Sequence, residues 1–173
     1  EGSDYSAAIL AFCLKAQSMT IWKDVPGLLN ADPKRLQHTT KLVSVQYSEA
    51  IELSYYGATI IHPKTIKPLQ NLSIPLYIKS FVNPDEEGSV ICKQEKIRPV
   101  VANYIFKDNQ ILLSIFPKDF SFIAEKNISS IFAILANNKV KVNLMQNSAI
   151  SFSVCFDENK NLLPQILNDL KQQ

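Results

Sequence analysis

The sequence is poor in glycine, and this scarcity excludes two well-known nucleotide-binding loops. It has four glycines in 173 residues, namely Gly2, Gly27, Gly57 and Gly88. Their spacing fits neither G-x-x-x-x-G-K-[ST] nor G-x-G-x-x-G, the patterns in which glycine lets the backbone approach phosphate groups closely. The chain therefore contains neither a Walker-type loop nor a Rossmann fingerprint.

Cysteine and histidine are equally scarce. Cys13, Cys92 and Cys155 are far apart without C-x-x-C spacing, and His38 and His62 belong to no H-E-x-x-H pattern. Separated thiols in odd number predict neither a disulfide framework nor a zinc site. Two isolated imidazoles likewise predict no metal centre. We therefore expect reduced thiols, a cytoplasmic location and no metal ligands.

Charge and hydropathy narrow the class of protein further. The 18 basic and 16 acidic residues leave a net charge of +2, and Arg35 and Arg98 are the only arginines. The guanidinium groups that usually read bases are nearly absent, so we expect no nucleic-acid partner. No apolar run approaches the roughly 18 residues of a membrane span, so we expect no membrane partner. The composition is that of an ordinary globular chain.

The composition changes along the chain, which predicts two domains. All four glycines and seven of the nine prolines precede residue 100, whereas the remainder is rich in asparagine. The polar segment 93–99 ends in proline, as segments between domains often do. We expect one domain over residues 1–95 and a second over residues 99–173.

Helices and strands alternate in the first segment, which predicts an α/β layer. Ser3 and Asp4 precede an apolar run and are expected to cap a helix that continues to about Ala16. Residues 24–34 contain Pro-Gly and Asp-Pro pairs and predict a long irregular loop, a feature that is often functional. Strands are expected at 19–23 and 74–79, and helices at 48–56 and 64–69.

The second segment has a different order of expected helices and strands. Strands are expected at 100–106, 110–116, 140–145 and 150–156, and helices at 122–137 and 162–170. The first two strands are expected to pair as a hairpin. From residue 110 the order is strand, helix, strand, strand, helix, which predicts a ferredoxin-like α+β sandwich without its last strand. The missing strand suggests truncation, or completion of the sheet by the strand 100–106 or by another chain.

The residue types alone leave the roles of several polar side chains open. Ser3 and Asp4 are common helix caps, and a helix N-terminus also holds carboxylates or phosphates. Asp24 and Asp32 frame the long loop at the carboxyl end of a strand, where open α/β sheets bind ligands, but aspartates also cap turns. The turn 143–148 presents amides and hydroxyls either to an amino acid or to its own backbone.

Four motifs in order resemble the C-terminal half of the catalytic domain of aspartate kinases. They are Gly-Ser-Asp-Tyr-Ser-Ala-Ala at 2–8, Ile-Trp-Lys-Asp-Val-Pro-Gly at 21–27 with Asp-Pro-Lys at 32–34, Glu-Ala-Ile-Glu-Leu at 49–53, and Ile-His-Pro-Lys-Thr at 61–65. The runs 131–136 and 142–148 resemble the ACT regulatory domain that follows in that family. The resemblance covers nearly the whole chain.

The resemblance implies the C-terminal part of an amino acid kinase fold, followed by a ferredoxin-like ACT sandwich. It implies transfer of the γ-phosphoryl group of ATP, with Mg, to the side-chain carboxylate of L-aspartate, the first step of lysine, threonine and methionine biosynthesis. It also implies feedback control by an end-product amino acid, lysine or threonine, a homodimer, and no permanently bound cofactor. The N-terminal half of that catalytic domain is missing, so the isolated segment is not expected to catalyse the reaction.

The resemblance also assigns site residues. Ser3 would contact the aspartate substrate, and Asp4 would lie between substrate and nucleotide. The nucleotide-binding residues would be Lys23, Asp24, Leu29, Lys34 and Thr59, where the family often has an aromatic residue at 29, arginine at 34 and lysine at 59. The effector-binding residues would be Val142, Asn143 and Ser148. Acidic residues often found at 143 and 149 are absent, so a lysine effector would lose two carboxylate partners.

Two alternatives remain at this point. One is a related amino acid kinase that acts on glutamate or uridylate, and the ACT-like segment after residue 99 disfavours it. The other is an amino-acid-binding regulatory module without catalysis, which would leave the loop 24–34 unexplained.

Overall fold

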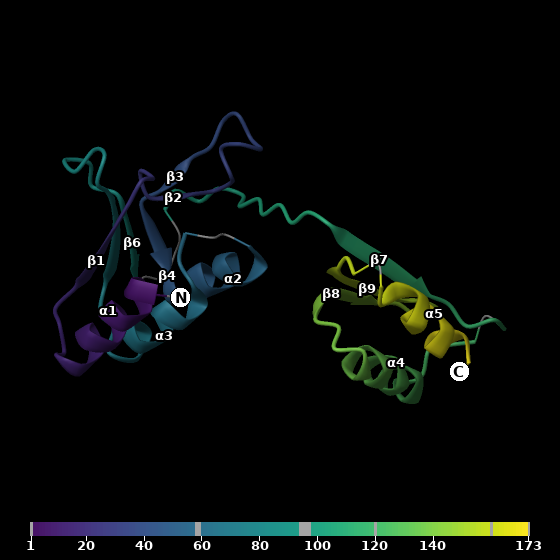
Figure 1. Ribbon diagram of the computed structural model, residues 1–173. Helices are drawn as coiled ribbons and strands as arrows, with labels where there is room; N and C mark the ends of the chain where they lie inside the picture. The colour runs from purple at the N-terminus through teal and green to yellow at the C-terminus, as the bar shows by residue number, and fades with distance from the viewer. Residues whose placement is uncertain (1, 58–59, 94–97, 120, 160, 173) are drawn as a thin grey trace. The chain divides into compact units, whose positions relative to one another are not determined.

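The computed structural model describes residues 2–57, 60–93, 98–119, 121–159 and 161–172 (Figure 1). The chain divides into two compact units, unit 1 from Glu1 to Phe106 and unit 2 from Lys107 to Gln173. The division therefore falls later than the sequence-based boundary between residues 95 and 99.

Hydrogen bonds explain why the segment after Pro99 belongs to unit 1. The backbone N–H of Tyr104 donates to the carbonyl of Asn30 at 2.7 Å, and the Asn30 side-chain amide donates to the carbonyl of Ala102 at 3.0 Å. Residues 100–106 form no strand. The expected hairpin of 100–106 with 110–116 is therefore wrong, because the first of these segments bonds to unit 1.

Unit 1 is built on a mixed four-stranded sheet in the order β1 (Met19–Lys23), β5 (Leu76–Ser80), β6 (Ser89–Cys92) and β4 (Ser44–Gln46). β1 and β5 are parallel, β4 and β6 are parallel, and β5 and β6 are antiparallel. A separate antiparallel pair joins β2 (Leu28–Leu29) to β3 (Lys41–Leu42). Part of the expected irregular loop 24–34 is therefore a strand, and β4 and β6 had no sequence-based prediction.

The three helices of unit 1 are α1 (Gly2–Cys13), α2 (Tyr47–Tyr56) and α3 (Pro63–Asn71). α3 contacts both other helices, and Figure 1 shows the three gathered together beside the sheet. Burial alternates along β1 and β5, so one face of each strand points into the core. The core combines buried residues of both layers, among them Ala8, Ile21, Ile66, Leu69, Leu76 and Ile78.

The helix ends follow from local backbone chemistry. α1 starts at Gly2, so Ser3 and Asp4 lie in its first turn and do not precede the helix as expected caps. α1 also stops at Cys13, earlier than expected, and Lys15 has a positive φ of 50°. Gly57 ends α2 as predicted, with a φ of 134° that favours glycine and with its N–H bonded to the carbonyl of Leu53.

Unit 2 contains β7 (Gln110–Ile115), α4 (Glu125–Asn137), β8 (Val142–Asn147), β9 (Phe152–Asp157) and α5 (Leu163–Lys171). The sheet order is β7-β9-β8, with both neighbours antiparallel to β9. This confirms the expected order of strand, helix, strand, strand, helix. The sheet matches a ferredoxin-like sandwich that lacks its fourth strand.

One face of the unit 2 sheet packs against both helices. Its core includes Phe152, Val154 and Phe156 of β9, Ile131 and Leu135 of α4, and Ile166 of α5. The alternate residues point to the other face, where Leu112 and Leu144 are exposed. Strand periodicity of two thus separates a helix-covered face from an open one.

Candidate functional site

A cavity of about 490 Å³ opens in unit 1 where the ends of four elements meet. They are the start of α1, the end of β1, the last turns of α2 and the start of α3. The lining residues are Gly2, Ser3, Asp4, Lys23, Ser54, Gly57, Ile60, Ile61, His62, Pro63 and Thr65. Polar groups from separate segments therefore converge on one space.

An ion pair joins two walls of this cavity. The ammonium of Lys23, the last residue of β1, lies 2.7 Å from a carboxylate oxygen of Asp4. Asp4 lies in the first turn of α1, where the helix dipole favours a negative charge. The side chain of Asp4 is 28% exposed and that of Lys23 is 30% exposed. The pair is therefore partly shielded from water and still accessible to a ligand.

The first backbone N–H groups of α3 are bonded to His62, the residue that precedes the helix. His62 caps the helix through Nδ1, which accepts the N–H of Lys64 at 3.1 Å, and Pro63 has no N–H to offer. The N–H of Thr65 donates to the carbonyl of His62 at 2.9 Å. Because Nδ1 accepts, the neutral imidazole carries its proton on Nε2. The N–H groups of Lys64 and Thr65 are therefore engaged within the chain.

Three of the predicted site residues meet in the cavity, namely Ser3, Asp4 and Lys23. Asp24 and Leu29 do not line it, and Leu29 lies in β2. Lys34 is also absent from the lining, and its N–H donates to the Asp32 carboxylate at 2.9 Å in a local turn. Thr59 lies outside the described residues.

Sequence reasoning missed part of the lining. Ser54 and Thr65 come from the last turn of α2 and the start of α3, and neither residue stands out in its own helix. No sequence spacing links them to Asp4, since tertiary packing alone brings these helices together. The motif 61–65 was the one available signal, and it pointed to the segment without distinguishing Thr65.

The predicted effector residues lie at opposite ends of β8 in unit 2. Val142 and Asn143 begin the strand, and Ser148 follows its end. Five residues of extended strand span roughly 16 Å. The Ser148 hydroxyl lies 2.7 Å from that of Ser151 within the turn. One copy of the chain therefore does not bring Asn143 and Ser148 together around a small ligand.

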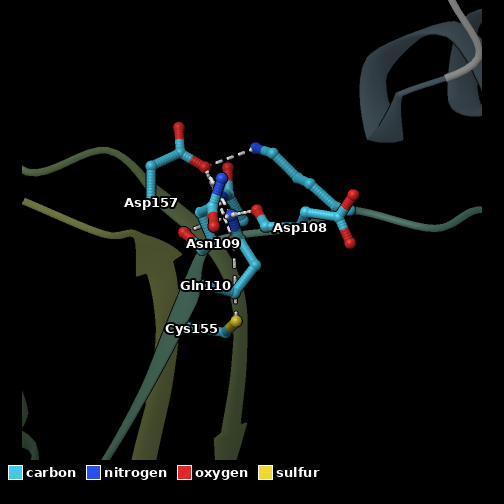
Figure 2. Close-up of polar contacts among 7 residues, drawn as sticks. Asp108, Asn109, Gln110, Cys155 and Asp157 are labelled. Atoms are coloured by element: carbon cyan, nitrogen blue, oxygen red, sulfur yellow. Dashed lines mark hydrogen bonds and ion pairs between the residues drawn. The ribbon is translucent and has the colours of Figure 1, made fainter.

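Asn143 belongs to a polar cluster around Asp157 that sequence reasoning missed (Figure 2). One carboxylate oxygen of Asp157 accepts from Gln110 Nε2 at 2.7 Å, Lys107 Nζ at 2.8 Å and Asn143 Nδ2 at 2.9 Å. The same Asn143 amide also donates to Gln110 Oε1 at 2.7 Å. These donors, with Gln110 first, lower the pKa of Asp157 to about 2.

The described residues contain neither a cluster of metal ligands nor a helix that could span a membrane. Within those ranges, no group of three or more histidine, cysteine, aspartate or glutamate side chains is arranged to hold a metal ion. Among the helices formed by the same residues, none has the length and apolar character needed to cross a membrane.

Comparison with known proteins places the first unit in a class. Residues 1–80 match the model of the amino acid kinase family, and this segment contains the cavity-lining residues. This match is a similarity to the amino acid kinase family over residues 1–80, and it agrees with the α/β fold described above.

Within that class, the similarity is to aspartokinases. The chain is 31% identical over 160 residues to lysine-sensitive aspartokinase 3 of Escherichia coli K12. That alignment covers 90% of this chain and 34% of the relative. It is 35% identical over 156 residues to the bifunctional aspartokinase/homoserine dehydrogenase of Buchnera aphidicola from Acyrthosiphon pisum, covering 90% of the chain and 19% of that relative. The chain thus spans a minor part of both curated relatives.

Solved structures of aspartate kinases are also similar to this chain. The aspartate kinase of Clostridium acetobutylicum superposes with a TM-score of 0.87 at 26% identity, over 99% of this chain and 41% of that one. Escherichia coli aspartokinase III in complex with lysine and aspartate superposes with a TM-score of 0.75 at 28% identity, over 96% of this chain and 39% of that one. These likenesses confirm the resemblance to aspartate kinases.

Proposed function

We propose that this chain is the part of an aspartate kinase that joins the C-terminal segment of the catalytic domain to an ACT regulatory domain. The enzyme would transfer the γ-phosphoryl group of ATP to the side-chain carboxylate of L-aspartate. The main support for the proposal is the ion pair of Asp4 and Lys23 in the cavity of unit 1. The chain that forms this cavity resembles an aspartokinase over 90% of its length. Aspartokinase III of Escherichia coli has been solved with aspartate and ADP, which supports these ligands.

The proposed reaction suits the chemistry of this cavity. An ionised substrate carboxylate attacks the γ-phosphorus directly, the bond to the bridging oxygen of ADP breaks, and no proton has to be removed first. The protein therefore needs to position and neutralise its ligands rather than supply a nucleophile. Lys23 brings an ammonium with three donors, of which Asp4 takes one. The hydroxyl of Ser3 is a further donor on the same wall and would contact L-aspartate.

ATP would enter with Mg, which usually keeps several waters and needs one or two protein carboxylates besides the phosphates. Among the described residues that line the cavity, Asp4 is the single carboxylate, so the donor set fits that pattern. Asp24, Leu29 and Lys34 would bind the nucleotide from beyond this cavity, with Leu29 against the base and Lys34 near a phosphate. Thr59 is a further proposed nucleotide-binding residue. Neither ligand would be permanently bound.

Unit 2 would bind an end-product amino acid, lysine or threonine, through Val142, Asn143 and Ser148. β8 is an edge strand of its sheet, so a second copy can pair with it. Of the possible antiparallel registers of two β8 strands, one centred between residues 145 and 146 would place Asn143 of one copy opposite Ser148 of the other. The separation of these residues within one chain thus supports a homodimer with effector sites at its interface. We also place the enzyme in the cytoplasm, where its free cysteines would stay reduced.

Isothermal titration of the 173-residue chain with L-aspartate, ADP, L-lysine and L-threonine tests the proposal. We expect saturable binding of L-aspartate or ADP, and Lys23→Met should weaken it about tenfold, because a charge-assisted hydrogen bond contributes about 1.5–3 kcal/mol. Lys67→Met is the matched control, since Lys67 is an exposed lysine of α3 that does not line the cavity. Absence of binding for both L-aspartate and ADP would contradict the kinase proposal.

Sedimentation with and without the four ligands tests the dimer separately. We expect L-lysine or L-threonine to shift the chain toward a dimer, because a ligand shared by two copies stabilises their association. A chain that remains monomeric with every amino acid would contradict the proposed effector site.

A further inference from the structure

Asn30 is a buried polar residue of unit 1 that does not line the cavity. It directly follows β2 and is 8% exposed. Its side-chain Oδ1 accepts the N–H of Thr40 at 2.7 Å, and its Nδ2 donates to the carbonyl of Ala102 at 3.0 Å. Its backbone N–H donates to the carbonyl of Thr40 at 3.0 Å, and its carbonyl accepts the N–H of Tyr104 at 2.7 Å.

These four bonds join two segments that are far apart in the sequence. The first segment, the arm, contains residues 28–42, which are β2, the loop after it and β3. The second, the connecting segment, contains residues 98–106 and continues directly into unit 2. Thr40 immediately precedes β3, so its two bonds close the base of the arm. The bonds to Ala102 and Tyr104 hold the connecting segment beside that base.

The connecting segment has further contacts at its two ends. At its start, the carbonyl of Arg98 accepts the N–H of Val43 at 2.7 Å, just beyond the arm. At its end, the guanidinium of Arg35 lies over the ring of Phe106, 5.8 Å from the ring centroid, and Phe106 is 46% exposed. The first contact lies outside the arm and the second is open to water. Asn30 is therefore the buried junction between the arm and the connecting segment.

The chemistry of the amide suits this junction. The N–H of Thr40 needs an acceptor and the carbonyl of Ala102 needs a donor, and asparagine offers both in one short side chain. The arm that the junction closes contains Leu29 and Lys34, which bind the nucleotide in the proposed function. An arm that is already held in place has less to order when a ligand binds.

We propose that Asn30 is a positioning residue for nucleotide binding, because it holds the arm against the connecting segment and so fixes the place of Leu29 and Lys34. The inference rests on the proposed function and extends it with a residue that acts through its neighbours. Because the connecting segment continues into unit 2, Asn30 also ties the arm to the part of the chain that links the two units.

Three variants of the 173-residue chain test this role. Asn30→Ala removes both side-chain bonds, whereas Asn30→Asp keeps an acceptor for the Thr40 N–H and loses the donor to Ala102. Asn138→Ala is the matched control, because Asn138 is also 8% exposed and its amide also makes two hydrogen bonds, but it lies in unit 2. ADP and L-aspartate are titrated calorimetrically, and amide hydrogen exchange is measured without ligand.

We expect Asn30→Ala and Asn30→Asp each to weaken ADP binding about tenfold, because ADP then binds only the fraction of chains whose arm is in place. Binding of L-aspartate should stay close to that of the wild type, since its proposed site in the cavity does not include the arm. Asn138→Ala should change neither affinity. A merely structural role of Asn30 would not separate the two ligands in this way.

Hydrogen exchange examines the two side-chain bonds one at a time. In Asn30→Ala, the amides of Thr40 and Tyr104 should both exchange faster than in the wild type. In Asn30→Asp, the amide of Tyr104 alone should exchange faster. Its acceptor is the backbone carbonyl of residue 30, which both variants retain, so faster exchange would show that the side chain holds the connecting segment.

Each contrary result has its own meaning. If both Asn30 variants bind ADP as the wild type does, or if Tyr104 exchange is unchanged in both, the positioning role is rejected and the kinase proposal stands. Equal loss of ADP and L-aspartate binding, or loss of the folded structure, also rejects it, because Asn30 would then only support the fold. A wild type that binds L-aspartate without ADP rejects the positioning role alone. A wild type that binds neither ligand rejects the kinase proposal and this role with it.

Discussion

The two units use similar polar groups in different surroundings. In unit 1, a carboxylate and an ammonium, Asp4 and Lys23, share a cavity wall. In unit 2, Asp157 and Lys107 pair at a similar distance, but the Asp157 side chain is 61% exposed. Water screens the second pair strongly and the first one less. The same residue types therefore form a candidate ligand site in one unit and a surface network in the other.

A core substitution in unit 2 tests whether the two units unfold independently. Phe152 is buried between β9 and α4, where its ring meets that of Phe132 at 5.7 Å between centroids. We expect Phe152→Ala to reduce the free energy of unfolding by about 3–5 kcal/mol through lost burial and a cavity. Urea unfolding followed by amide signals of each unit should show the loss in unit 2 alone.

Leu112→Ala is the control for that experiment, because Leu112 is 68% exposed on the open face of the same sheet. Its effect should stay within about 0.5 kcal/mol. Equal destabilisation of both units by Phe152→Ala would contradict the division at residues 106 and 107.

Alkaline pH should destabilise unit 1 through Tyr47. Burial, followed by the nearby Cys92, raises the pKa of Tyr47 to about 12, and its hydroxyl donates to the carbonyl of Ile74 at 2.6 Å. Because the pKa is higher in the folded state than the usual 10, the phenol stabilises the fold below pH 10. Between pH 10 and 12 the unfolded chain ionises first, and about 2–3 kcal/mol of this contribution is lost.

Denaturant midpoints measured from pH 8 to 12 check this prediction. Tyr47→Phe should flatten the decline for unit 1, since phenylalanine does not ionise. An equally steep alkaline decline in the phenylalanine variant would assign the transition to another group.

Acid should act on unit 2 through Asp157, with the smallest effect of the three. The pKa of Asp157 is lowered from 3.8 to about 2, so its contribution to stability is complete above pH 4 and is lost as the pH falls toward 2. The exposed position limits the contribution to less than about 1 kcal/mol. The difference in unfolding free energy between the wild type and Asp157→Asn should therefore vanish near pH 2, and 1 M salt should reduce it at pH 6. A difference that is independent of pH would contradict the charge-based explanation.

Much of the fold could be predicted from local patterns. The alternation in 19–23 predicted β1, and Gly57 predicted the end of α2. The same logic failed at 100–106, where apolar alternation predicted a strand but Tyr104 and Ala102 bond to Asn30 instead. β4 and β6 escaped notice because they are short and begin with buried serines, whose environment depends on pairing.

The candidate site was predictable in part, through motif resemblance. Ser3, Asp4 and Lys23 were assigned to neighbouring roles and line one cavity, whereas Leu29 and Lys34 lie outside that lining. The Asp157 cluster had no sequence signal at all. Its members are Lys107, Gln110, Asn143 and Asp157, which come together only when β7 and β8 flank β9.

By itself, the sequence determined most helices and strands, the two-part composition and the resemblance to aspartate kinases. Periodicity, caps and turn residues act over a few neighbouring positions, so they can be recognised along the chain. The tertiary structure alone decided that Asp4 meets Lys23, that Asn30 bonds to both Thr40 and Ala102, and that residues 100–106 belong to unit 1. These features depend on which element ends pack together, and long-range burial sets that choice rather than local preference.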